Sequence, residues 1–426
     1  MTATFAELNL LPELQRAITE AGYTEPTPIQ RQAIGPALAG RDIVGCAQTG
    51  TGKTAAFALP VLQRLDASAG DDPKIRALVL APTRELAAQI GESFATYGKH
   101  LKDIWHTVIF GGVPEGAQIR ELGRGVDVLV ATPGRLLDLM GRRFVDLRQV
   151  EMFVLDEADH MLDMGFLPDV KRIIAALPAR RQNLMFSATM PPEIRTLAAT
   201  MLRDPVQVGI AVVNKPIEKI EERLYFVAKP NKPKLLLSLL QGGAITRTLV
   251  FSRTKHGANR VVEFLEKGGV RAAAIHGNKS QGARTRALDN FKKGDLRVLV
   301  ATDIAARGID VDGVSHVINF DLPNVPETYV HRIGRTARAG AAGIALSFCD
   351  HEEHVFLRDI ERLIGHGLTR VEGGEFADDP RAASNVSASN VRPPARPQPA
   401  RGGPRGPRPA SRGRGRGPGP GTGSRR

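Results

Sequence analysis

Short apolar runs alternate along this chain with stretches of helical periodicity, and the alternation occurs twice. The runs that predict strands are Ile43–Ala47, Ala77–Ala81, Val126–Ala131, Met152–Leu155 and Leu184–Ser187 in a first set, and Thr248–Ser252, Ala272–His276, Val298–Thr302, Val317–Asn319 and Ile344–Phe348 in a second. Helical periodicity lies between them, as in Arg84–Tyr97 and Lys255–Glu266. Strands that alternate with helices predict a parallel sheet covered on both faces. Two such sets predict an α/β protein with two tandem lobes.

The length of 426 residues agrees with this division, because it exceeds one ordinary domain. We place a first lobe at residues 1–208 and a second lobe at 218–370. A linker at 209–217 separates them, since Asn214, Lys215 and Pro216 interrupt the pattern there. In parallel α/β folds, ligands bind beyond the carboxyl ends of the strands. Functional residues are therefore expected just after the apolar runs.

The last segment, 371–426, is predicted to be disordered. From Pro380 onward, 47 residues hold 10 Pro, 9 Gly and no aromatic side chain, so they cannot bury a core. The same stretch carries 11 Arg and no Lys, Asp or Glu. Because the whole chain carries +13, the first 379 residues carry only +2. We interpret this basic tail as a loose RNA tether, with a merely solubilising tail as the alternative.

Targeting signals are not evident in the sequence. The N-terminal segment has early acidic residues and no basic start before an apolar core, so no signal peptide is expected. No apolar run approaches the roughly 20 residues that span a bilayer. The two cysteines, Cys46 and Cys349, are far apart and form no disulfide framework or metal cluster. These features favour a cytoplasmic protein.

A phosphate-binding loop is predicted between the first strand and the helix that follows it. Its residues are Ala47, Gln48, Thr49, Gly50, Thr51, Gly52, Lys53 and Thr54. Glycines let backbone N–H groups approach the phosphates of a nucleotide. Lys53 is then expected at the β- and γ-phosphates and Thr54 at a Mg²⁺ ion.

An acidic pair follows the fourth apolar run. Asp156 could hold Mg²⁺, and Glu157 could orient and polarise the attacking water. An acidic helix N-terminus that merely stabilises the helix is the alternative. The phosphate loop upstream favours the catalytic interpretation.

The run Asp156–Asp159 reads Asp-Glu-Ala-Asp, and with it the chain resembles the DEAD-box ATP-dependent RNA helicases over roughly residues 5–365. Within that family it looks most similar to the bacterial RhlE-type enzymes. The resemblance implies two RecA-like lobes, ATP and Mg²⁺ as cofactors, and RNA as partner. It also implies that Phe5 stacks on adenine and that Gln30 hydrogen-bonds its edge. The Gln30 amide suits that role, since it both donates and accepts.

Residues 331–338 resemble the family's last motif, with His331, Arg335 and Arg338 expected on one helix face. The family resemblance makes the two arginines charge-stabilising fingers at the γ-phosphate, whereas spacing alone also allows a solvated basic face. The family usually has Gly where this chain has Ala337, whose methyl is expected to suit a helix. Other positions carried over by resemblance are Asp310 at the ribose, Thr302 at the RNA backbone, and Ser187 and Thr189 hydrogen-bonded to Asp159.

The predicted RNA contacts also follow apolar runs. They are Thr83, Arg84, Gly112, Thr132 and Arg135 in the first lobe, and Arg253, Gly277, Gln281 and Arg284 in the second. Threonine, arginine and exposed N–H groups bind phosphate and read no base, so little sequence preference is expected. Preference for RNA over DNA would come from 2′-OH contacts or backbone shape. Trp105 carries no motif and is expected to serve packing.

The predicted activity is RNA-stimulated ATP hydrolysis coupled to lobe closure, which unwinds short duplexes and remodels RNA or RNA–protein complexes. A DNA translocase built on the same lobes is one alternative, and a non-catalytic RNA chaperone acting through the tail is another. The DEAD run and the adenine-reading segment disfavour the DNA translocase. The set of Lys53, Asp156, Glu157 and Arg335 disfavours the non-catalytic chaperone. Family members act in ribosome assembly, RNA decay and cold adaptation, and the sequence does not choose among them or their protein partners.

Overall fold

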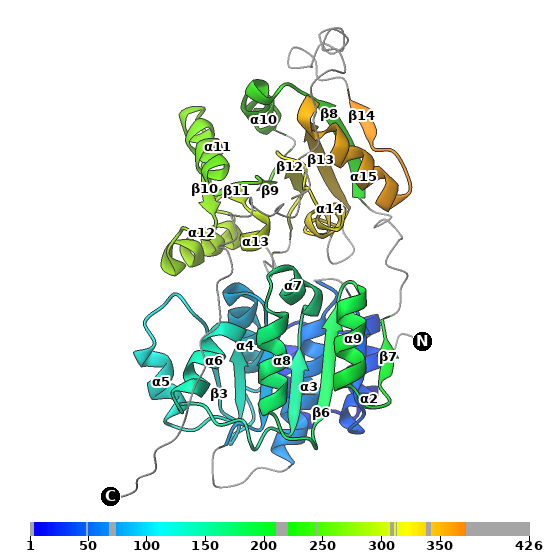
Figure 1. Ribbon diagram of the computed structural model, residues 1–426, viewed down its shortest axis with the longest axis vertical. Helices are drawn as coiled ribbons and strands as arrows, with labels where there is room; N and C mark the ends of the chain where they lie inside the picture. The colour runs from blue at the N-terminus through cyan, green and yellow to red at the C-terminus, as the bar shows by residue number, and fades with distance from the viewer. Residues whose placement is uncertain are drawn as a thin grey trace, which may run out of the picture. The chain divides into compact units, whose positions relative to one another are not determined.

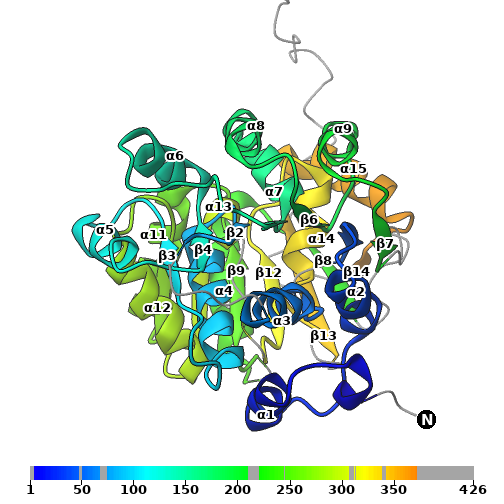
Figure 2. The same cartoon turned by 90° about the horizontal axis from the view of Figure 1, so that it is seen from below.

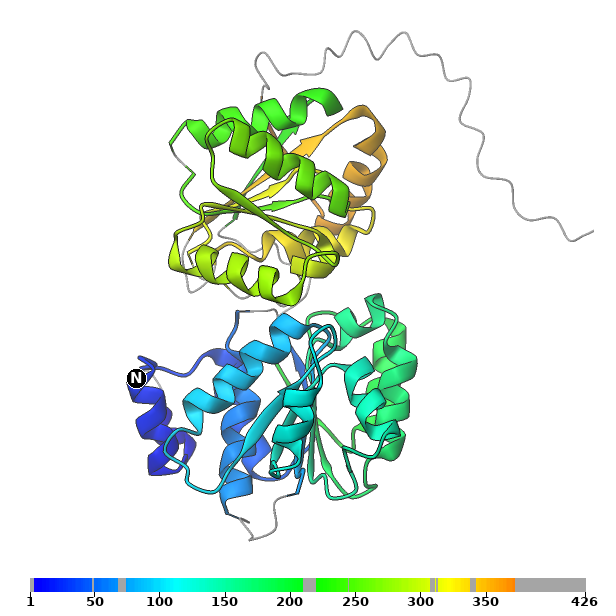
Figure 3. The same cartoon turned by 90° about the vertical axis from the view of Figure 1, so that its left-hand side faces the viewer.

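The computed structural model describes residues 4–47, 50–67, 74–209, 220–243, 245–306, 311, 313–337 and 342–371. Within these ranges the chain forms two seven-stranded sheets, each with helices on both faces (Figures 1 and 3). Every strand pairing in both sheets is parallel. The predicted fold class, two RecA-like lobes with parallel sheets, is confirmed. The predicted linker and tail fall almost wholly outside the described residues.

The first sheet has the strand order β3-β4-β2-β5-β6-β1-β7. Its strands are β1 (Ile43–Cys46), β2 (Ala77–Leu80), β3 (His106–Ile109), β4 (Val128–Ala131), β5 (Met152–Leu155), β6 (Gln182–Ser187) and β7 (Val206–Val208). The helices of this lobe are α1 (Pro12–Glu20), α2 (Pro28–Leu38), α3 (Lys53–Asp66), α4 (Arg84–Tyr97), α5 (Gly116–Leu122), α6 (Pro133–Gly141), α7 (Ala158–Asp163), α8 (Leu167–Ala176) and α9 (Pro192–Met201).

Alternating side chains of the central strands fill two cores, one on each face of the first sheet. In β2, Ala77 and Val79 belong to one core, and Leu78 and Leu80 to the other. This alternation follows from the two-residue period of a strand. Figure 2 shows α2, α3 and α4 on one face and α6, α8 and α9 on the opposite face. Because both faces are covered, the strands read as continuous apolar runs.

The second sheet repeats this plan with the order β10-β11-β9-β12-β13-β8-β14. Its strands are β8 (Ile220–Phe226), β9 (Thr248–Phe251), β10 (Ala272–Ile275), β11 (Val298–Ala301), β12 (His316–Asn319), β13 (Gly343–Cys349) and β14 (Thr369–Val371). Its helices are α10 (Lys232–Gln241), α11 (Lys255–Lys267), α12 (Gln281–Lys293), α13 (Asp303–Ala306), α14 (Pro326–Ile333) and α15 (His354–Ile364). Threonine and serine hydroxyls cap two of these helices: Thr254 accepts from the N–H of Gly257 and Ser280 from that of Ala283.

Buried ion pairs add to the apolar cores of both lobes. The Arg76 guanidinium donates to the Asp127 carboxylate at 2.8 Å, and both side chains are about nine-tenths buried. Lys232, which is fully buried, lies 2.5 Å from a Glu353 oxygen and 3.1 Å from an Asp350 oxygen. Removing one partner of such a pair leaves a charge without compensation in a low-dielectric interior.

One expectation about the fold is wrong. The side chain of Trp105 is 64% exposed, although it was expected to serve packing. The main chain of Trp105, in contrast, is hydrogen-bonded: its N–H donates to the Asp127 carboxylate at 2.9 Å. Its carbonyl accepts from the N–H groups of Asp127 and Val128 where β3 and β4 begin to pair.

Candidate nucleotide and RNA site

The phosphate loop leaves β1 at Cys46 and leads into α3 at Lys53. Gly50 and Gly52 have φ of +82° and +85°, which favour glycine. A Cβ on Gly52 would lie 2.5 Å from the Gln30 amide nitrogen, so a side chain there would displace the Gln30 amide. Gln48 and Thr49 lie outside the described residues, whereas Ala47, Thr51 and Thr54 lie within them.

Lys53 is 5% exposed, and its Nζ lies 3.6 Å from a carboxylate oxygen of Asp156. Among the described residues no hydrogen-bond acceptor reaches that Nζ. Burial alone would lower the pKa of Lys53, but the carboxylates of Asp156, Glu157 and Asp159 outweigh it and raise the pKa. A buried lysine that stays cationic with unused N–H groups is suited to bind an anion.

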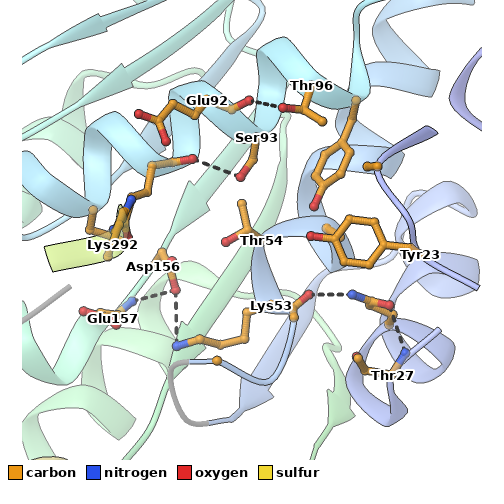
Figure 4. A pocket seen from close by; sticks show the side chains of 18 residues that line it. Tyr23, Thr27, Lys53, Thr54, Glu92, Ser93, Thr96, Asp156, Glu157 and Lys292 are labelled. Atoms are coloured by element: carbon orange, nitrogen blue, oxygen red, sulfur yellow. Dashed lines mark hydrogen bonds and ion pairs between the residues drawn. The ribbon is translucent and has the colours of Figure 1, made fainter. Parts of the chain in front are cut away.

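Lys53 opens onto a cavity of about 630 Å³, which is within the size range of small-molecule sites. Thr54, Asp156, Glu157, Gln30 and Tyr23 also line it. Figure 4 shows Lys53 extended toward Asp156, with Thr54 and Tyr23 on the neighbouring walls. The predicted phosphate, metal and water-activating residues therefore share one cavity.

The segment that was predicted to read adenine lies on α2 and the loop before it. Gln30 is 3% exposed; its oxygen accepts from the N–H of Thr27 at 2.9 Å, and its amide donates to the carbonyl of Gly52 at 3.0 Å. Each amide end keeps one further hydrogen-bonding capacity. Gln30 thus ties this segment to the phosphate loop.

The placement of Phe5 corrects one predicted contact. Phe5 packs in the core of the first lobe, is 7% exposed and does not line the cavity. Tyr23, which is 48% exposed, lines it instead, beside Tyr97 at a ring-centroid distance of 6.3 Å. The short motif around Gln30 contains Tyr23, so its aromatic ring was the available signal for this position.

The acidic residues follow β5 and are almost completely buried. Glu157 has φ of +53°, a left-handed conformation that carries backbone strain for a residue with a Cβ, and it precedes α7. Its N–H donates to a carboxylate oxygen of Asp156 at 2.9 Å. Burial raises the pKa of Asp156 despite the nearby Lys53. Burial also favours a higher pKa for Glu157, but contacts with His160, then the Lys53 and Arg335 charges, hold that pKa well below its usual range.

Asp159 is held by the segment that follows β6. One of its carboxylate oxygens accepts from the N–H of Thr189 at 2.8 Å and from its hydroxyl at 2.9 Å. Its own N–H donates to the Ser187 hydroxyl at 3.1 Å. Both hydroxyls therefore make the hydrogen bonds to Asp159 that the sequence led us to expect, and they join the ends of β5 and β6.

The last motif of the second lobe is not one continuous helix, which corrects the expected shared helix face. Helix α14 ends at Ile333, and Arg335 lies in the turn after it, with its Nε donating to the carbonyl of His331 at 3.3 Å. Ala337 has φ of +57°, so its methyl sits on a left-handed residue and not in a helix. Arg338 lies outside the described residues. Arg335 is 5% exposed and lines a small cavity of about 20 Å³ together with Glu157.

A neighbouring arginine was overlooked in the sequence. Arg332 is 2% exposed and forms a two-pronged ion pair with the Asp303 carboxylate at 2.5 and 2.8 Å. It also donates to Asn319 and to the carbonyl of Asp321. Arg332 thereby fixes α14 against β12 and the segment after β11, which contains Thr302. Asp310, the predicted ribose contact, lies outside the described residues.

The predicted RNA-binding residues of the first lobe lie at the carboxyl ends of β2, β3 and β4. The Thr83 hydroxyl caps α4 by accepting from Leu86, and Thr132 precedes α6. Arg84 lies against Gly112, where a Cβ would overlap its guanidinium. Arg135 donates to Gln118 at 3.0 Å. Thr83 and Thr132 are buried, and Arg84 and Arg135 are half-buried.

In the second lobe Arg253, Gln281 and Arg284 have protein partners. Arg253 donates to Glu353 at 2.5 Å and to the carbonyl of Leu322 at 3.0 Å. The Arg284 guanidinium pairs with Glu85 at 2.8 Å, and the Gln281 amide donates to the same carboxylate at 2.9 Å. Gly277 follows β10, and a Cβ there would meet nothing within 4 Å. The arginines are thus partly neutralised by neighbouring carboxylates.

Comparison with known proteins finds helicase matches along most of the chain. Residues 27–197 match the DEAD/DEAH box helicase family and residues 231–340 match the helicase conserved C-terminal domain. The chain is 42% identical over 400 residues to the DEAD-box ATP-dependent RNA helicase CshA of Bacillus subtilis, covering 92% of this chain and 80% of CshA. It is 45% identical over 371 residues to the ATP-dependent RNA helicase DeaD of Mycobacterium tuberculosis, covering 87% of this chain and 65% of DeaD.

Solved structures agree with these sequence matches. Dbp5 of S. cerevisiae bound to RNA and ADP BeF3 aligns with a TM-score of 0.79 and 34% identity, covering 87% of this chain and 96% of Dbp5. Mss116p bound to ssRNA and AMP-PNP aligns with a TM-score of 0.80 and 28% identity, covering 87% of this chain and 80% of Mss116p. In the described ranges no helix is long and apolar enough to cross a membrane. From the site geometry and these matches we conclude that the chain belongs to the DEAD-box family of ATP-dependent RNA helicases.

Proposed function

We propose that this helicase unwinds short RNA duplexes locally by closing its lobes around ATP and one RNA strand. The observation that carries the proposal is the buried cation of Lys53, whose Nζ has no hydrogen-bond acceptor among the described residues. It stands beside Asp156 and Glu157 in a cavity large enough for a nucleotide. Dbp5 bound to RNA and ADP BeF3, which aligns along both lobes, supports this assignment.

In the nucleotide site, Lys53 binds the β- and γ-phosphates, and the N–H groups of the phosphate loop bind the phosphate oxygens. The Gln30 amide reads the adenine edge, and Tyr23 stacks on the ring in place of Phe5. The Thr54 hydroxyl and the Asp156 carboxylate are oxygen donors on one cavity, so they fit a Mg²⁺ ion. When bound, Mg²⁺ neutralises charge on the phosphates.

Glu157 orients and polarises the water that attacks the γ-phosphate. Its lowered pKa keeps it ionised at neutral pH, as this role requires. Arg335, with Arg338 as its proposed neighbour, supplies positive charge to the γ-phosphoryl group as it is transferred. Because Arg335 belongs to the second lobe, hydrolysis depends on closure.

RNA lies across the carboxyl ends of both sheets and is held through its sugar–phosphate backbone. Thr83, Arg84, Arg135 and Thr302 are among its contacts, and none is placed to read a base. Asp159, Ser187 and Thr189 couple the acidic residues to the segment after β6. A bent single strand in the closed groove excludes the regular duplex, so the complementary strand is released.

Within the family we place the chain with the RhlE-type enzymes, because it joins two lobes to a basic tail. We also propose the cytoplasm as its compartment, in line with two free cysteines. Proteins of ribosome assembly or RNA decay are proposed partners on the range of processes in the family alone.

Two substitutions test the catalytic assignment. With saturating single-stranded RNA, Glu157→Gln should lower kcat for ATP at least about 100-fold, and Arg335→Ala about 1,000-fold or more. Arg358→Ala removes an exposed arginine from α15 of the same lobe and should leave kcat unchanged. AMP-PNP affinity should persist in all three variants. Normal turnover in Glu157→Gln would show that another residue activates the water.

A further inference from the structure

His160 contacts the carboxylate of Glu157, the residue proposed to activate the attacking water. It is 2% exposed, and its Nδ1 lies 2.8 Å from an oxygen of Glu157. The two residues are three apart across the start of α7, so their side chains meet on one side of the helix. Nothing in the sequence motifs singled out His160.

The contact fixes which ring nitrogen carries the hydrogen. An ionised carboxylate only accepts hydrogen bonds, so Nδ1 of His160 must donate to Glu157. In the neutral ring Nε2 is then an acceptor, and it lies 3.4 Å from Nδ1 of His331. The two rings meet edge to face with centroids 4.9 Å apart. A chain of hydrogen bonds of one polarity, from His331 through His160 to Glu157, fits this arrangement.

We propose that His160 is a positioning residue, which holds the Glu157 carboxylate in the orientation for water activation and makes that orientation depend on His331 of the second lobe. The inference rests on the proposed role of Glu157. The Nδ1 hydrogen bond restricts rotation of the Glu157 carboxylate about its side-chain bonds. His331, Gly334 and Arg335 line the same small cavity as His160 and Glu157, so the second lobe reaches the carboxylate through this contact.

Two conservative substitutions at position 160 separate the functions of the two ring nitrogens. Asn at position 160 places an N–H₂ group near the position of Nδ1 and keeps the donor to Glu157, but it does not extend to His331. Gln places its amide near the position of Nε2 and keeps the reach to His331, but it loses the donor at Nδ1. A residue that only fills space would not distinguish them.

The test is steady-state ATP hydrolysis by the full chain with saturating single-stranded RNA. We expect His160→Ala and His160→Gln to lower kcat about tenfold or more, in line with the loss of a hydrogen bond to a charged group, while KM for ATP stays within about twofold. His160→Asn should recover part of kcat, clearly more than His160→Gln, because it restores the donor to Glu157 but not the contact with His331. Equal losses in the Asn and Gln variants would overturn the role of Nδ1.

The link to the second lobe is tested by combining His160→Ala with His331→Ala. If both act through Glu157, the double variant should be no slower than the slower single variant. Multiplicative losses would overturn the link. AMP-PNP affinity and thermal melting separate these effects from misfolding, and His160→Asn remains informative if the alanine variant does not fold. If Glu157→Gln itself leaves kcat unchanged, the proposed function fails; if Glu157→Gln is slow and His160→Ala is normal, only this inference fails.

Discussion

Replacing Ala337 by glycine should stabilise the second lobe, although Ala→Gly substitutions usually destabilise proteins. Ala337 has φ of +57°, where a residue with a Cβ carries a strain of roughly 1–2 kcal/mol. The greater freedom of glycine in the unfolded chain costs about 0.4–1 kcal/mol. The midpoints of these ranges differ by about 0.8 kcal/mol, which is the expected gain in the free energy of unfolding.

The control is Ala228→Gly, in the same lobe but at φ of −60° and ψ of 139°, a conformation that alanine adopts without strain. This variant should lose about 0.4–1 kcal/mol. The chain's single tryptophan, Trp105, belongs to the first lobe, so the second lobe is better followed by amide hydrogen exchange of β12 and β13. If both variants lose stability equally, Ala337 is not left-handed in solution and the described end of this motif is wrong.

Three further predictions follow from the sequence and the structure. Asp127→Ala should destabilise the first lobe by about 3–5 kcal/mol, because it leaves the buried Arg76 without its carboxylate. The control Asp146→Ala, at an exposed ion pair, should cost less than about 1 kcal/mol. Equal losses of the two variants in urea unfolding would contradict the stabilising role of the buried pair. Gly112→Ala should displace the guanidinium of Arg84 and weaken RNA binding without changing AMP-PNP affinity, as fluorescence anisotropy can show. Deleting the basic tail from residue 380 onward should weaken RNA binding at low salt and make the RNA affinity less dependent on salt, while ATPase activity persists. An unchanged RNA affinity would refute the interpretation of the tail as an RNA tether.

The sheets could be predicted largely because they are parallel and covered on both faces. Their central strands, such as Val128–Ala131 and Met152–Leu155, are continuous apolar runs between turn residues. The strands that escaped prediction lack this pattern. In β3, His106 and Thr107 interrupt the apolar residues, and β8 contains three charged side chains because it lies next to the edge of its sheet. These segments form strands because they pair with a neighbouring strand, and a single sequence does not reveal that pairing.

The candidate site was predictable where a motif follows a strand, and less so where tertiary packing decides. Lys53, Asp156 and Glu157 share one cavity because β1 and β5 flank β6 and end at the same edge. The end of α14 before Arg335 was missed because helical spacing alone does not mark where a helix stops. Phe5 was assigned to adenine by resemblance, whereas burial in the core removes it from the cavity. No sequence motif marked His160, since its proposed role comes from contacts that form only in the folded structure.

The central claim is that ATP hydrolysis in the first lobe depends on RNA bound across both lobes. It is tested most directly by steady-state ATP hydrolysis without nucleic acid, with single-stranded RNA, and with DNA of the same sequence. The account predicts strong stimulation by RNA and little by DNA. Equal stimulation by DNA would favour a DNA translocase, and no hydrolysis under any condition would favour a protein that only binds RNA.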